Sequence, residues 1–148
     1  IERLARDARI TNIYEGTSQL QIVAAMGGVV NDLLAEDFNR KADKIYKGSL
    51  SRLAEYLKDI RKIYLDCLKY ILDKNEVQFQ EVASRDLVEL YSYQYVGYLL
   101  LDEAEIEPRK IFIANRYIVS ALAKARSNAE AIKNEQFSDL LHADEILT

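Results

Sequence analysis

The fold is decided by residues 50–71, which read LSRLAEYLKDIRKIYLDCLKYI. Apolar side chains recur there at alternating steps of three and four residues, at Leu50, Leu53, Leu57, Ile60, Tyr64, Cys67 and Ile71. This spacing places them along one side of an α-helix and predicts a long helix with a single buried stripe. No segment of the chain alternates apolar and polar residues in the manner of a half-buried strand. We therefore expect an all-α protein.

Three other segments have helical patterns of their own. Residues 20–34 carry apolar or small residues at helical spacing, and residues 87–101 are apolar on almost every face, which predicts the most buried helix. Pro108 suits the first turn of a fourth helix that continues to residue 132. The expected stripes are Leu20, Val23, Gly27, Val30 and Leu34 in the first helix and Ile111, Ala114, Ile118, Ala121, Ala125 and Ile132 in the last.

The connections predict how these helices are arranged. A polar stretch over residues 36–47, followed by Gly48, separates the first helix from the second, and the later links are short. Helices joined by short links pack side by side in opposite directions, so we expect an antiparallel up-down four-helix bundle with a short C-terminal helix. Gly27 and Gly28 each weaken the first helix by about 1 kcal/mol relative to alanine, so either a neighbouring element approaches closely there or the helix bends. We favour the close approach.

Composition restricts the class of protein and its partners. A chain of 148 residues is one domain's worth, and it buries about two-thirds of its unfolded surface. Its 20 basic and 24 acidic residues are well mixed, which argues against nucleic acid as a partner. The longest apolar runs fall well short of the roughly 20 residues that span a bilayer. One cysteine gives no disulfide framework, which fits a reducing compartment, and we expect a cytoplasmic protein.

Most chemistry-bearing side chains have an ordinary structural interpretation. His142 is the only histidine and is expected on the surface of the short C-terminal segment. Cys67 lies on the apolar stripe, where a buried thiol behaves as a small hydrophobe. Cysteine, histidine and carboxylate residues are not clustered at metal-ligand spacing, so we expect no metal site.

The exception is the run Ile13-Tyr14-Glu15-Gly16-Thr17-Ser18-Gln19-Leu20-Gln21. Gly16 gives the backbone conformational freedom next to Glu15, and Thr17 or Ser18 suits the N-cap of the helix that follows. The free N–H groups at such a helix start favour an anionic group. The chain therefore places one carboxylate on a hinged loop directly before a helix, which is a plausible position for a catalytic base. A solvated glutamate on a capped loop is the alternative.

Together with Arg6-Asp7-Ala8-Arg9-Ile10-Thr11, this run resembles the C-terminal signature of the acyl-CoA dehydrogenases, flavoenzymes that oxidise the α,β bond of acyl-CoA thioesters. The resemblance covers roughly the first 25 residues. It implies FAD as cofactor, an acyl-CoA substrate, an electron-transferring flavoprotein as partner and a homo-oligomer, with reoxidation of the flavin by oxygen left open. It makes Glu15 the catalytic base, Tyr14 and Gly16 substrate-binding residues, and Thr17, Ser18 and Gln19 cofactor-binding residues.

The resemblance also implies a division of the chain. Residues 1–38 correspond to the end of the family's C-terminal helical domain, and residues 39–148 resemble the C-terminal helical extension of a larger subgroup. The sequence departs from the family at Ile22, where an arginine is common. Because Ile1 lies inside what reads as a helix, we interpret the chain as a fragment that is inactive alone.

A second interpretation belongs to a different class. The chain is then a non-catalytic helical interaction module that has inherited the signature. Its subunit contacts would use the apolar surface of the third helix and the notch at Gly27 and Gly28. Upstream segments that bind flavin would favour the enzyme, and their absence would favour the module.

Overall fold

The computed structural model describes residues 3, 6–7 and 18–135, and these confirm the all-α class. No strand occurs within these ranges. The elements are α2 (Ser18–Val30), α3 (Ala35–Asp43), α4 (Ser49–Lys74), α5 (Val77–Ile106), the 3₁₀ turn η2 (Pro108–Lys110) and α6 (Ile111–Lys133).

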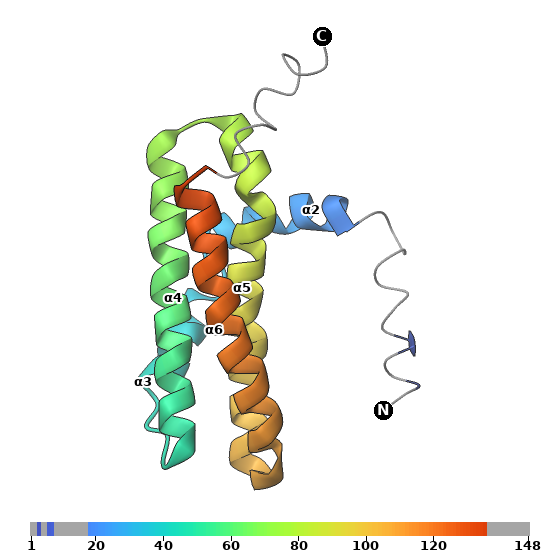
Figure 1. Cartoon of the computed structure of the whole chain (residues 1–148), viewed down its shortest axis with the longest axis vertical. Helices are drawn as coiled ribbons and strands as arrows, with labels where there is room; N and C mark the ends of the chain where they lie inside the picture. Colours follow the sequence, from blue (N-terminus) through green and yellow to red (C-terminus); the bar gives the residue numbers. More distant parts are fainter. Residues whose placement is uncertain (1–2, 4–5, 8–17, 136–148) are drawn as a thin grey trace.

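Three long helices, α4, α5 and α6, form an antiparallel bundle, and each contacts the other two (Figure 1). Asn75 closes α4 in the left-handed conformation (φ 52°), with its N–H donating to the Leu72 carbonyl at 3.1 Å. Asparagine tolerates that conformation better than most residues, so the chain reverses within two residues before Val77. Pro108 opens η2, which runs directly into α6.

The stripes expected for α4 and α6 form the centre of the bundle. Leu53, Leu57, Ile60 and Ile71 are at most 1% exposed. Three alanines of α6, Ala114, Ala121 and Ala125, are buried in the same core as the bulkier residues of α4 and α5, so large and small side chains interlock. The buried stripe residues are Leu53, Leu57, Ile60, Tyr64, Cys67 and Ile71 in α4 and Ala114, Ile118, Ala121, Ala125 and Ile132 in α6, with Leu50 and Ile111 partly buried.

The single cysteine occupies this core as predicted. Cys67 is fully buried, and burial raises the pKa of its thiol to about 11. The reactive thiolate is therefore a minor species at neutral pH. The helix expected to be most buried, α5, supplies the largest set of buried side chains, although Tyr95 and Leu99 face solvent.

The expectation for the first helix is partly wrong. This helix ends at Val30 rather than continuing to Leu34, and it crosses the bundle against α5 instead of running beside the long helices (Figure 1). Leu20 and Val23, which the periodicity placed on a buried stripe, are 60% and 58% exposed. Val29 alone is buried in α2. Because α2 is apolar on nearly every side, its spacing could not identify the side that faces the bundle.

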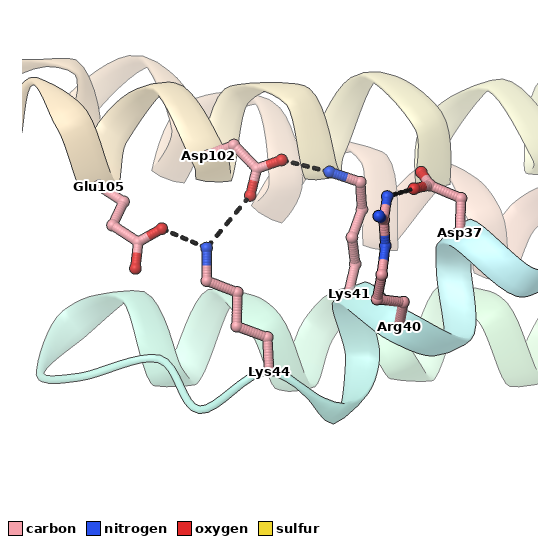
Figure 2. A network of polar contacts seen from close by, with 6 residues as sticks. All are labelled: Asp37, Arg40, Lys41, Lys44, Asp102 and Glu105. Atoms are coloured by element: carbon pink, nitrogen blue, oxygen red, sulfur yellow. Dashed lines mark hydrogen bonds and ion pairs between the residues drawn. The ribbon is translucent and has the colours of Figure 1, made fainter.

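The polar connection expected over residues 36–47 contains a further helix, α3. Its one large apolar side chain, Phe38, is 1% exposed and packs within the bundle core. On its outer side Lys41 pairs with Asp102 of α5, while Lys44 pairs with Glu105 and lies 3.7 Å from Asp102 (Figure 2). A single apolar residue makes no period, so the sequence pattern could not reveal this helix.

The glycine expectation is also wrong. A Cβ added at Gly27 would meet nothing within 4 Å, and one at Gly28 would meet only the side chain of Leu33 from the following turn. The close approach in the fold occurs instead at Gly97 of α5, where a Cβ would overlap the Leu57 methyl of α4. Gly97 therefore allows α4 and α5 to pack closely around Leu57.

We predict opposite effects for alanine at two of these glycines. Gly97→Ala should lower the free energy of unfolding by about 1–2 kcal/mol, because overpacking outweighs the gain in helix propensity. Gly27→Ala, at an open helical position, is the matched control and should raise that free energy by up to about 1 kcal/mol. Chemical denaturation of the two variants measures both changes. Equal stabilisation by both substitutions would contradict the close packing at Gly97.

Candidate functional site

The signature run leads into α2, which begins at Ser18. Tyr14, Glu15, Gly16 and Thr17 lie outside the described residues. Ser18 and Gln19 occupy the first turn of α2, and both are exposed. Among the described residues, α2 begins at Ser18, which is three positions after the signature glutamate in the sequence.

The first turn of α2 has the chemistry to meet a polar or anionic group. The first N–H groups of any helix have no partner within the helix, and they lie at the positive end of its dipole. No acidic residue in that turn competes for them. The exposed hydroxyl of Ser18 and amide of Gln19 add further donors and acceptors.

The side of α2 that faces α5 borders a small hollow of about 160 Å³. Its lining includes Val23 and Met26 of α2 and Val77 and Ser84 of α5. Sites for small organic ligands usually enclose about 300–1,000 Å³. This hollow is therefore a packing gap between the two helices and is too small for an acyl-CoA.

The far end of α2 is tightly fixed by the turn formed by residues 31–34. The N–H of Leu33 donates to the Gly28 carbonyl and that of Asp32 to the Val29 carbonyl, each at 3.1 Å. This pair of bonds is a Schellman motif, which requires a left-handed residue just after the helix. Asp32 fills that position with φ 50°. Glycine is the usual residue there, and aspartate is one of the few others that adopt this conformation; here a further interaction holds it.

That interaction comes from Arg61 of α4. Its guanidinium donates two hydrogen bonds to the carboxylate of Asp32, and the one from Nη1 to Oδ1 is 2.8 Å long. The two side chains are only 13% and 19% exposed. The same guanidinium lies 5.3 Å from the ring centres of Phe38 and Tyr64. Arg61 is therefore oriented by stacking as well as by its charge partner, and a lysine could not reproduce both contacts.

Two tyrosines bind the backbone on either side of the same turn. The hydroxyl of Tyr64 donates to the Val29 carbonyl at 2.6 Å, and the N–H of Leu34 donates to the hydroxyl oxygen of Tyr91 at 2.7 Å. Burial raises the pKa of both phenols, so the hydroxyls stay protonated across the physiological range. We refer to Asp32, Arg61, Tyr64 and Tyr91 together as the turn anchor.

The sequence analysis missed the turn anchor. One usable signal was Asn31-Asp32 directly after an apolar helix, since these residue types tolerate the left-handed conformation. The other was Arg61, which sits between Leu57 and Tyr64 at helical spacing on the edge of the apolar stripe. Nothing in a single sequence links the two positions, which are 29 residues apart.

Within residues 3, 6–7 and 18–135, no group of three or more histidine, cysteine, aspartate or glutamate side chains is arranged to hold a metal ion. None of the helices in the same ranges is both long and apolar enough to cross a membrane.

A crystal structure described as an acyl-CoA dehydrogenase family protein from Porphyromonas gingivalis has a similar fold. The TM-score is 0.68, and the match covers 74% of this chain and 96% of that chain at 16% sequence identity. At this identity the similarity establishes the fold alone. No protein-family model and no curated protein matches the sequence.

We predict that the charge pair of the turn anchor is a measurable source of stability. Arg61→Met keeps the apolar packing and should lower the free energy of unfolding by about 2 kcal/mol. The substitution leaves the carboxylate of Asp32 without the two hydrogen bonds from the guanidinium. Arg52→Met, on the exposed side of α4, is the control and should change it by less than about 0.5 kcal/mol.

A double-mutant cycle with Asp32→Gly tests the pairing directly. Glycine suits the left-handed position, so the loss of the carboxylate is separated from backbone strain. The coupling energy between Arg61→Met and Asp32→Gly should be about 1–3 kcal/mol. Additive effects in the cycle would show that the pair contributes nothing beyond its separate residues.

Proposed function

We propose that the chain is the C-terminal helical part of an FAD-dependent acyl-CoA dehydrogenase, with Glu15 as the catalytic base. The observation that carries the proposal is the signature itself, Tyr14-Glu15-Gly16-Thr17-Ser18-Gln19, in the order and spacing of that family. Its support from the structure is the helix start at Ser18. The similarity in fold to a protein described as an acyl-CoA dehydrogenase family member points the same way.

The proposed reaction is the α,β-dehydrogenation of an acyl-CoA thioester. Glu15 accepts the proton from the α-carbon while a hydride leaves the β-carbon, so that a double bond forms between the two carbons. FAD, when bound, supplies the acceptor for that hydride. A carboxylate suits the role of base because a dry pocket raises its pKa toward that of an α-proton acidified by hydrogen bonds to the thioester carbonyl.

The other signature residues would hold the reactants around this base. Tyr14 and Gly16 line the acyl-CoA site in the proposal, with Gly16 allowing close approach of the backbone. Thr17, Ser18 and Gln19 contact the flavin dinucleotide at the start of α2. The exposed positions of Ser18 and Gln19 leave their polar groups accessible for this contact.

In this proposal residues 1–38 contribute the signature, α2 and the start of α3, while residues 39–148 form the helical extension. The boundary between the two parts falls within α3. Phe38 and Val29 from the first part share one apolar core with the long helices of the second. The extension would therefore act as a rigid base against which α2 is fixed. In the whole enzyme, which we propose to be a homo-oligomer, an electron-transferring flavoprotein would receive the electrons.

A non-catalytic interaction module is the second candidate, and one observation favours it. Leu20 and Val23 form an exposed apolar surface on α2, which is the kind of surface that a partner covers. The same residues would be covered by neighbouring helices of the enzyme in the first proposal. Bound flavin in the full-length protein distinguishes the two, because only the enzyme requires it.

The test of the proposed function is Glu15→Gln in the full-length protein. This variant keeps the size of the side chain and removes the base, so it should retain FAD and bind acyl-CoA. The rate of flavin reduction under anaerobic conditions should fall by about 100- to 10,000-fold. Stopped-flow absorbance of the flavin measures that rate.

Glu36→Gln, at an exposed position of α3, is the matched control and should reduce its flavin at the normal rate. Normal reduction by Glu15→Gln would place the base elsewhere. Failure of the unaltered full-length protein to bind flavin would favour the interaction module.

A further inference from the structure

The N-terminal part of the described fold is joined to the bundle by few apolar side chains. We call residues 18–46, which comprise α2, the turn after it, α3 and the start of the α3–α4 connection, the strap. Of the buried apolar side chains in the described ranges, only Val29, Phe38 and Tyr46 belong to the strap. The others belong to α4, α5 and α6, each of which contacts the other two. The three long helices therefore have a core of their own.

Phe38 is the one large side chain that joins α3 to this core. Its ring meets the ring of Tyr91 edge-on, with 5.2 Å between the ring centres, and stacks on that of Tyr98 at 6.1 Å. The guanidinium of Arg61 lies 5.3 Å from its centre. Most of the apolar contact between α3 and the bundle therefore depends on a single ring.

The remaining attachments of the strap are polar. The turn anchor holds the residues between α2 and α3, and two ion pairs hold the side of α3 that faces α5 (Figure 2). These pairs are Lys41 with Asp102 and Lys44 with Glu105, and all four side chains are partly exposed. Water replaces partly exposed ion pairs at little cost in free energy, so the two pairs hold the strap only weakly.

Some buried polar atoms between the strap and the bundle form no hydrogen bond. In the described part of the chain these unpaired atoms are the hydroxyls of Tyr46 and Tyr98, Nε of Arg61 and Oε1 of Gln94. Tyr46 belongs to the strap, and Tyr98 and Arg61 both contact Phe38. A buried polar atom without a partner costs free energy that contact with water would recover. Three of the four atoms therefore favour separation of the strap from the bundle.

The connection to α4 provides a hinge. Gly48 has φ 59°, and a Cβ added there would meet nothing within 4 Å. Lys47 and Gly48 are both exposed. Because glycine changes its backbone conformation at low cost, the chain can change direction at this point. Such a movement leaves α4 intact, since this helix begins at Ser49.

We propose that the strap opens and closes as one unit about Gly48 while α4, α5 and α6 stay folded. One aromatic ring and a few polar contacts hold the closed state, whereas a continuous core holds the bundle. Units of this kind open at a lower free energy than the whole fold.

This proposal does not depend on the proposed function. If that function holds, opening would carry α2 away from the long helices, and with it the loop that bears Glu15, so the open state would be inactive. The experiment below measures the opening alone, so its outcome is independent of that of the flavin experiment.

Native-state hydrogen exchange of the 148-residue chain, followed by NMR at denaturant concentrations below the unfolding transition, tests the proposal. The amides of Leu33, in the turn, and Arg40, in α3, should exchange through one common opening. That opening should depend on denaturant less steeply than the exchange of Ile118 in α6, because it exposes less surface. About 0.5 M salt should speed the exchange of both strap amides about threefold by screening the ion pairs.

Phe38→Ala should speed the exchange of both strap amides at least about 100-fold. Ile132→Ala, at a fully buried position of α6, is the matched control. It should speed the exchange of Ile118 about 30-fold or more and leave the strap amides at their original rates. Lys41→Gln removes only one ion pair, so it keeps the test valid if the Phe38 variant fails to fold. It should speed both strap amides about threefold, whereas Lys69→Gln, at an exposed position of α4, should not.

Equal acceleration of strap and core amides in Ile132→Ala would show that the strap and the bundle unfold together, and it would overturn the proposal. Different openings for Leu33 and Arg40 would also overturn it, because the strap would then consist of segments that fray independently.

Discussion

The bidentate pair of hydrogen bonds between Arg61 and Asp32 is the interaction on which the placement of α2 and the turn after it depends. α2 buries only Val29, so its own apolar surface holds it weakly against the bundle. The turn that follows α2 is instead fixed by the guanidinium of Arg61 and by the hydroxyls of Tyr64 and Tyr91. These side chains belong to α4 and α5, which are themselves set by the close packing of the core. The orientation of α2 is thus determined by side chains of the long helices.

This arrangement explains why the signature and the bundle occur in one chain under the proposed function. A catalytic base has to be held within a fraction of an ångström of its productive position, and a loop alone does not provide such rigidity. In the proposal, α2 connects the loop that carries Glu15 to the turn anchor. The long helices would then contribute to catalysis through geometry, without touching the reactants.

The sequence predicted the elements whose pattern comes from one-sided burial. Helices α4 and α6 each have a polar and an apolar side, so helical spacing alone identified their buried residues. α2 is apolar on nearly all sides, so the spacing of its apolar residues did not identify the buried side correctly. α3 has only Phe38 as a large buried side chain, so the spacing did not reveal this helix. Gly97 was missed because close packing depends on which residue of another helix lies opposite. For the candidate site, the sequence supplied the motif and the helix start, but it could not supply the pairing of Arg61 with Asp32.

Amide hydrogen exchange in Tyr91→Phe tests the central claim most directly, because the substitution removes only the hydroxyl that accepts the N–H of Leu34. The account predicts that the amides of Leu34 and of the last turn of α2 exchange about tenfold faster, as expected for the loss of one buried hydrogen bond. The amide of Ile118 in the core of α6 should exchange at its original rate. Unchanged exchange in α2 would contradict the account, and so would equal acceleration at Ile118.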